Sequence, residues 1–277
     1  MEVIIQRDEL SAAWLVARVI AKELRANPRL VLGLAAGRTM EVVYSYLVRL
    51  HRDEGLDFSR CHTFNLDEYV GLGPDDSNSY RGYMNRHLFR HVNLDLRQTH
   101  LPDGLDADLD AECRDYEALI EKAGGIDLQL LGIGRNGHIG FNEPLSAFTS
   151  RTRVEVLAPA TLEQNGGHFG GRDKMPRRAI TMGVGTILES RRSILLAAGG
   201  NKADMVAQAV EGPLTSMIPA SALQMHPRCS VVLDEMAAGQ LTRKDDYRRM
   251  FANEPAWKEF QESAPPKVGD AVLRNPD

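Results

Sequence analysis

A glycine-rich segment at residues 33–39, GLAAGRT, has the features of an anion-binding loop. It follows an apolar run and opens a helical pattern, so its backbone N–H groups would lie at a helix start, where the helix dipole favours negative charge. Gly37 lets the backbone approach a ligand closely, and Arg38 and Thr39 could add side-chain donors. A plain strand-to-helix turn explains the segment equally well. The Walker spacing GxxxxGK[ST] is absent.

Two adjacent carboxylates, Asp67 and Glu68, stand where the predicted strand at residues 62–66 ends. Neighbouring residues of a strand point to different sides, so only one of the two is expected to face a site. A carboxylate there can act as a general base. A helix cap or a solvated loop acid is the structural alternative.

The loop at residues 132–144, GIGRNGHIGFNEP, presents His138 and Glu143. It contains a literal G-x-G-x-x-G, but Gly140 and Pro144 oppose the helix that a dinucleotide-binding loop needs directly after its last glycine. Histidine can move protons near neutral pH, and a carboxylate close by can orient it and stabilise its charge. The loop therefore favours acid–base chemistry over dinucleotide binding and over a structural histidine.

Lys202 follows another apolar run and opens a helical pattern, in the segment GGNK at residues 199–202. Its ammonium could meet an anion, although a solvated lysine at a helix start is common. The sequence motifs of two other kinds of active site are absent. No GxSxG elbow supports a hydrolase triad, and the scattered histidines predict no metal site.

Alternating strands and helices must position these segments. Strands are expected at residues 30–34, 62–66, 127–133, 179–182, 193–198 and 230–233, and helices over residues 39–51, 80–88, 110–122 and 202–210. Ser77 is the expected N-cap of the second helix, and Gly124 and Gly125 end the third. Because no run of paired hairpins occurs, the order predicts an α/β fold: a doubly wound, mostly parallel sheet with helices on both faces, in a Rossmann-like arrangement. Such sheets bind ligands at the carboxyl ends of their strands.

Length and composition limit the classes of protein. The 277 residues suit one domain over residues 1–240, followed by a surface helix and a loose tail over 241–277. A net charge of −5 argues against a general nucleic-acid binder, and no apolar run of about 18 residues predicts a membrane span. Three distant cysteines and the lack of a secretory start indicate a reducing, cytoplasmic compartment.

Five motifs, in this order, resemble the glucosamine-6-phosphate deaminase (isomerase) family over roughly residues 1–238. They are TFNLDEYVGL at 63–72, GHIGFNEP at 137–144, SRTR at 150–153, ITMGVGTIL at 180–188 and LQMHP at 223–227. The resemblance implies conversion of glucosamine 6-phosphate to fructose 6-phosphate and ammonia without a redox cofactor. It implies that His138, supported by Glu143 and Asn136, opens the sugar ring, and that Asp67 then moves a proton between carbons 2 and 1.

The sequence departs from the family pattern at the phosphate end of the expected site. Ala36 lacks the hydroxyl of the usual Thr-Gly-[Ser/Gly]-Thr-Pro loop, and Gly167 stands where the family carries a phosphate-binding arginine. Arg38, His168 and Lys202 are the groups that could compensate. Many members also carry aspartate where this chain has Asn136, whose amide can orient a neighbour but supplies no charge.

Some members of the resembled family are hexamers with an allosteric aminosugar-phosphate site. Arg153 matches one element of that site, whereas Glu155 replaces a lysine and would repel an anion. We therefore expect weak or absent activation of this kind, and the resemblance leaves a homo-oligomer open.

The sequence leaves three alternatives to the deaminase. One is an isomerase or deaminase of a related aminosugar, of galactosamine type or weakly dependent on phosphate. Another is a lactonase on a related fold, against which the FNLDEY motif speaks. The last is a non-catalytic sugar-phosphate sensor, which should keep binding groups and lose catalytic ones, the reverse of this sequence.

Overall fold

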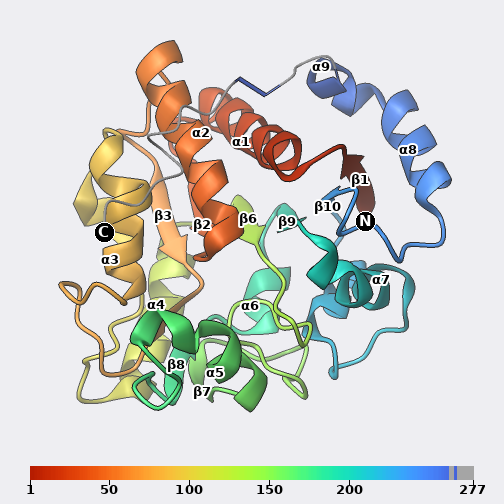
Figure 1. Ribbon diagram of the computed structural model, residues 1–277. Helices are drawn as coiled ribbons and strands as arrows, with labels where there is room; N and C mark the ends of the chain where they lie inside the picture. The colour runs from red at the N-terminus through yellow and green to blue at the C-terminus, as the bar shows by residue number, and fades with distance from the viewer. Residues whose placement is uncertain (262–264, 267–277) are drawn as a thin grey trace.

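A seven-stranded parallel sheet forms the centre of the protein (Figure 1). The computed structural model describes residues 1–261 and 265–266. The strands lie in the order β1-β10-β9-β6-β2-β3-β5, and every pairing between them is parallel. Their bounds are β1 (Glu2–Gln6), β2 (Val31–Leu34), β3 (His62–Asn65), β5 (Thr99–His100), β6 (Leu128–Leu131), β9 (Ser193–Ala197) and β10 (Cys229–Asp234). The α/β class expected from the sequence is confirmed.

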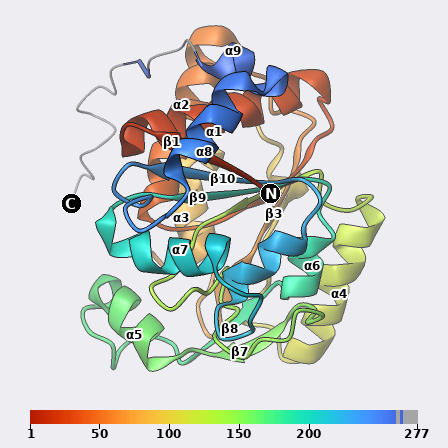
Figure 2. The ribbon, with the colours of Figure 1, turned by 90° about the vertical axis from the view of Figure 1, so that its right-hand side faces the viewer.

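Helices cover both faces of this sheet (Figure 2). On one face lie α1 (Glu9–Ala26), α2 (Arg38–Glu54) and α8 (Lys244–Asn253), and on the other lie α4 (Leu109–Lys122), α6 (Val184–Leu188) and α7 (Ala203–Glu211). The remaining helices are α3 (Tyr80–His87), α5 (Pro159–Asn165) and α9 (Lys258–Gln261). None of the described helices is both long and apolar enough to cross a bilayer.

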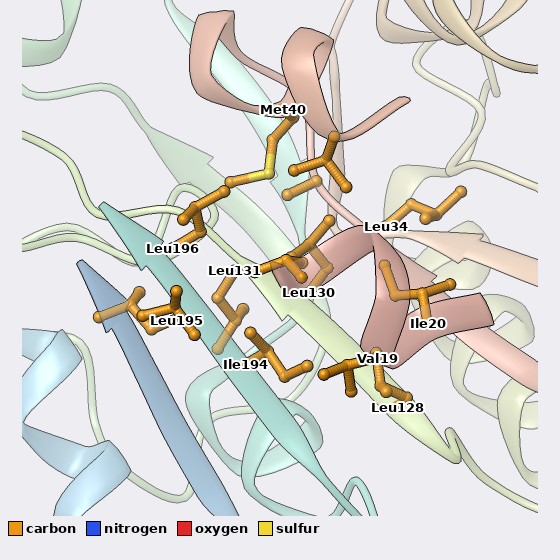
Figure 3. Close-up of a cluster of buried hydrophobic side chains, with 14 of the residues drawn as sticks. Val19, Ile20, Leu34, Met40, Leu128, Leu130, Leu131, Ile194, Leu195 and Leu196 are labelled. Atoms are coloured by element: carbon orange, nitrogen blue, oxygen red, sulfur yellow. The ribbon is translucent and has the colours of Figure 1, made fainter. Parts of the chain in front are cut away.

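The main core lies between the central strands and the helices α1 and α2 (Figure 3). Leu130 and Ile194 of adjacent strands and Ile20 of α1 are all completely buried. A strand covered on both faces needs apolar residues on both of its sides, which explains the unbroken apolar runs in the sequence. Burial of each such side chain stabilises the fold by about 1.5–3 kcal/mol.

A second, antiparallel sheet was not expected from the sequence. It consists of β4 (Asp67–Tyr69), β8 (Arg178–Thr181) and β7 (Arg153–Val156), with β8 in the middle. The predicted strand at residues 179–182 belongs to this sheet. Only Leu66 separates β3 from β4; its N–H donates to Leu34 O and its carbonyl accepts from Met182 N, so the chain steps from one sheet to the other there. The other two strands, β4 (DEY) and β7 (RVEV), carry charged residues and form no apolar run, so the sequence did not mark them.

Helix ends follow local chemistry, with one correction. Ser79, not Ser77, is the N-cap of α3: its hydroxyl accepts the N–H of Gly82 over 2.9 Å. The end of α4 agrees with the prediction, because Gly124 and Gly125 both take positive φ, at 89° and 82°. Neither β1 nor α1 was predicted from the sequence.

The surface helix expected beyond Arg243 is α8, in which no side chain is buried. Farther along, Trp257 and Phe260 are buried against the main core. The Arg192 guanidinium lies 5.5 Å from the Trp257 ring centroid, and that of Arg18 lies 5.0 Å from the Phe260 ring centroid. The chain therefore returns to the domain after α8. Most of the expected loose tail lies at residues 262–264 and 267–277, outside the described residues.

Candidate active site

A cavity of about 550 Å³ at the carboxyl ends of the parallel strands collects most of the predicted site residues. They reach it from separate elements: Gly37, Arg38 and Thr39 from the start of α2, Asp67 from β4, His138 from the loop after β6, and Lys202 from the turn after β9. Asn136 and Glu143 do not line the cavity; they contact each other close to His138. The expected position of a ligand in a parallel sheet agrees with this arrangement.

A larger hollow of about 850 Å³ lies between α4 and α6 and contains none of the predicted residues. Its central acid, Glu117, already accepts hydrogen bonds from Thr152 and Thr186 and pairs with Arg151 over 2.6 Å. These polar groups are hydrogen-bonded to one another. The smaller cavity, which contains the predicted residues, is therefore the candidate active site.

Asp67 presents a buried carboxylate to the cavity, with only 6% of the residue exposed. Gly140 lies beside it: a Cβ at that position would stand 3.5 Å from Asp67 Oδ2 and 2.9 Å from Thr181 Oγ1. With φ at +56°, residue 140 also adopts a conformation that suits glycine. Burial, together with the neighbouring charge of Glu68, raises the pKa of Asp67 well above its usual value.

Glu68 points away from the cavity and has a structural task. Its carboxylate accepts the N–H groups of Tyr69, Tyr80 and Arg81 over 2.8, 2.9 and 3.0 Å, which places it at the start of α3. Burial outweighs these hydrogen bonds and raises the pKa of Glu68 to about 7. The two adjacent acids thus divide as strand alternation predicts: one faces the cavity and the other holds a helix.

His138 and Glu143 form a buried pair, with 3.5 Å between His138 Nδ1 and Glu143 Oε2. Asn136 donates to the same carboxylate oxygen over 2.7 Å, while Thr161 Oγ1 donates to Glu143 Oε1 over 2.5 Å. Burial alone would raise the pKa of Glu143, but hydrogen bonds from His138, Thr161 and Asn136 lower it to about 2. The carboxylate therefore stays ionised across the physiological pH range and can hold a proton on Nδ1, which leaves Nε2 for exchange.

Asn136 contacts both members of this pair: its Nδ2 donates to Glu143 Oε2, and its Oδ1 accepts the backbone N–H of His138 over 3.3 Å. Thr161 was missed altogether. It lies on α5, 18 residues beyond Glu143, and no spacing signal connects residues that meet only through the tertiary fold.

Groups that could bind an anion line the cavity at the start of α2 and in the turn after β9. Gly37 is the N-cap of α2 and takes φ +132°, and no side chain caps this helix. The N-terminal end of α2 lines the cavity. Lys202 Nζ donates to Ile133 O over 2.6 Å, and burial lowers the pKa of Lys202 to about 8. His168 also lines the cavity. Gly167 does not line it, and nothing stands within 4 Å of where its Cβ would be.

Residues that could bind a metal are not gathered here. His87 and His91 have the i, i+4 spacing of some metal sites, yet His91 Nε2 bonds Arg86 O over 2.7 Å and the His87 ring packs on Tyr83. Among the described residues, no group of three or more His, Cys, Asp or Glu side chains could hold an ion.

Residues 8–232 match the protein family described as glucosamine-6-phosphate isomerases/6-phosphogluconolactonase. This chain belongs to that family. The glucosamine-6-phosphate deaminase of Bacillus velezensis is 51% identical over 223 residues, which are 80% of this chain and 92% of the relative. The enzyme of the same name from a Geobacillus species is 49% identical over 236 residues, 85% of this chain and 93% of its own.

Solved structures in the glucosamine-6-phosphate isomerase/6-phosphogluconolactonase family share the fold. A structure described as a monomeric glucosamine-6-phosphate deaminase superposes with a TM-score of 0.85 at 44% identity and covers 87% of this chain and 100% of its own. The 6-phosphogluconolactonase of Trypanosoma cruzi reaches a TM-score of 0.69 at 20% identity, over 87% of this chain and 97% of its own. The second likeness concerns the fold alone.

The family resemblance also raised an allosteric anion site at Arg153. The Arg153 guanidinium pairs with Glu155 over 2.6 Å and donates to Ser146 and Asn142 over 2.9 Å each. Its charge is thus matched by a carboxylate of the same chain. Weak or absent activation by an aminosugar phosphate stays a prediction.

Proposed function

We propose that this chain is a glucosamine-6-phosphate deaminase, which converts glucosamine 6-phosphate and water to fructose 6-phosphate and ammonia. The observation that carries the proposal is that Asp67 and His138 line one cavity together with the cationic groups Arg38 and Lys202. Membership of the family and the names of relatives at about half identity support the same activity.

Ring opening is assigned to His138. The ionised Glu143 keeps the imidazole oriented through Nδ1, so Nε2 is free to take the proton of the anomeric hydroxyl and deliver it to the ring oxygen as the ring bond breaks. Asn136 donates a hydrogen bond to Glu143 over 2.7 Å and so fixes the position of this carboxylate. The open-chain aldehyde that results has an acidic proton on carbon 2.

Proton transfer between carbons is assigned to Asp67. Its carboxylate takes the proton from carbon 2 and returns it to carbon 1, which leaves an imine at carbon 2 that water hydrolyses to the ketose and ammonia. Burial makes this carboxylate a stronger base than a solvated one, because the charged form loses hydration. Gly140 leaves the face of Asp67 unobstructed for the substrate. The steps are proton transfers and a hydrolysis, and they need no redox cofactor or metal.

Phosphate binding is assigned to the donors and cations that line the same cavity. The backbone at Gly37, the side chains of Arg38 and Thr39 and the ammonium of Lys202 would hold the phosphate group. A helix N-terminus with nearby cations suits a phosphate monoester.

An ammonia-release assay with purified protein tests the activity and separates the alternatives. We expect release from glucosamine 6-phosphate well above that from galactosamine 6-phosphate or unphosphorylated glucosamine. Faster release from either of those two sugars would favour the related aminosugar activity. Tight binding of glucosamine 6-phosphate without turnover would favour the sensor.

Two properties of the protein remain proposals. We infer a cytoplasmic location, since Cys61, Cys113 and Cys229 are all free and buried, as in a protein that keeps reduced thiols. A homo-oligomer remains open; the solved relative at 44% identity is described as monomeric.

A further inference from the structure

Arg135 is a cation that lines the cavity and has no role in the proposed reaction. It stands in the loop after β6 and is exposed to solvent. Its backbone N–H donates to Gln164 Oε1 over 3.2 Å, which ties this loop to α5. In the part of the chain that the structure describes, no carboxylate forms an ion pair with the Arg135 guanidinium.

Lys202 is held beside the same loop. Its ammonium donates to Ile133 O, two residues before Arg135, and it too forms no ion pair within the described residues. Burial and then the charge of Arg135 lower the pKa of Lys202 to about 8. Two like charges near each other, neither of them in an ion pair among the described residues, repel, and an anion placed between them would remove that repulsion.

The size and charge of the expected anion follow from the remaining groups. The uncapped N-terminal end of α2 opens on the same cavity, with Arg38 and Thr39 in its first turn. A phosphate monoester carries nearly two negative charges at neutral pH and three acceptor oxygens, enough to engage two cations and a helix start together. A carboxylate carries only one negative charge, so it could not neutralise both cations.

We propose that Arg135 and Lys202 form a two-cation clamp for the phosphate group of the substrate, and that Arg135 sets the preference for phosphorylated over unphosphorylated aminosugars. The proposal rests on the proposed function, since it names the groups that hold the phosphate there. The family carries a phosphate-binding arginine where this chain has Gly167. In this chain Arg135, on the same loop as His138, would supply that contact.

Replacement of Arg135 tests the clamp in steady-state kinetics. We expect Arg135→Gln to raise the KM for glucosamine 6-phosphate about 10- to 100-fold, the usual effect of losing one charge-assisted contact, with kcat within about threefold of wild type. Arg135→Lys should fall between the two, because lysine keeps the charge and loses the planar fork. Arg60→Gln, which removes an exposed arginine outside the cavity, is the matched control. A KM for Arg135→Gln within twofold of wild type, or a loss confined to kcat, overturns the clamp.

Calorimetric titration with inorganic phosphate at pH 7.5 gives a readout that needs no turnover. We expect Arg135→Gln to bind phosphate at least about tenfold more weakly than wild type and Arg60→Gln, with an unchanged melting temperature. Equal phosphate affinity in Arg135→Gln and wild type overturns the clamp. A wild-type protein that binds phosphate but releases no ammonia from any aminosugar phosphate refutes the proposed function, and this titration then still decides the role of Arg135.

Discussion

The Thr161 hydroxyl donates a 2.5 Å hydrogen bond to Glu143 Oε1, and this contact joins α5 to the carboxylate that faces His138. The N–H of Ala158, directly before α5, donates to the same oxygen over 3.1 Å. Asn136 engages the other oxygen of the carboxylate. Glu143 is therefore held by α5 on one side and by the glycine-rich loop on the other. The orientation of the imidazole depends on where α5 lies.

Removal of the Thr161 hydroxyl should weaken the reaction more than the binding of substrate. A buried hydrogen bond to a charged group contributes about 1.5–3 kcal/mol, so we expect Thr161→Val to lower kcat about 10- to 100-fold with a small change in KM. Thr161→Ser keeps the donor and should retain most of the rate. Steady-state kinetics on the three proteins would make this comparison. Equal kcat for Thr161→Val and wild type would show that the position of Glu143 does not depend on this contact.

The sequence predicts the parallel sheet and the positions of individual site residues because their signals are local. Apolar runs mark most of the strands, and Asp67, His138 and Lys202 all lie in segments that follow predicted strands. Contacts between distant segments have no such signal: Thr161 of α5 reaches Glu143, and Arg135 in the loop after β6 approaches Lys202 in the turn after β9, only in the folded chain. The antiparallel sheet was missed because β4 and β7 are short and carry charged residues, so no apolar run marks them.

The pH dependence of kcat/KM should show an acid limb from Asp67 and an alkaline limb from Lys202. Asp67 must be ionised to act as a base, and because its pKa is raised, activity should fall with decreasing pH well above the usual range of an aspartate. Lys202 must be protonated to attract phosphate, and its pKa of about 8 predicts a loss as the pH rises past that value. Lys202→Arg, which stays protonated, should move the alkaline limb upward. An alkaline limb that does not move in this variant would assign it to another group.

Gly167→Arg tests whether position 167 can still supply a phosphate contact. The space around a Cβ at 167 is open, so the side chain can be accommodated. We expect the substitution to lower the KM for glucosamine 6-phosphate, and to do so more strongly in Arg135→Gln than in the wild-type chain, because the two arginines would serve the same anion. A double-mutant cycle on KM measures this difference. Equal effects in both backgrounds would mean that the two positions act independently.

Leu145 adopts φ +78° with 73% of the residue exposed, directly after the glycine-rich loop at residues 132–144. A Cβ in this left-handed region costs about 1–2 kcal/mol, and glycine avoids that cost at the expense of more freedom in the unfolded chain. Leu145→Gly should therefore raise the free energy of unfolding by about 0.5–1 kcal/mol in urea denaturation. Leu145→Ala keeps the Cβ and should bring no gain. A stabilising alanine would indicate that exposure of the leucine, and not its backbone, is the unfavourable feature.

Exchange of the carbon 2 proton with solvent is the measurement that tests the account most directly. Wild-type protein incubated with glucosamine 6-phosphate in D₂O should incorporate deuterium into the sugar, while Asp67→Asn, which removes the base from the cavity and keeps its size, should show none and should retain its melting temperature and circular-dichroism spectrum. Normal exchange and turnover in a folded Asp67→Asn protein would contradict the assignment of Asp67 as the base.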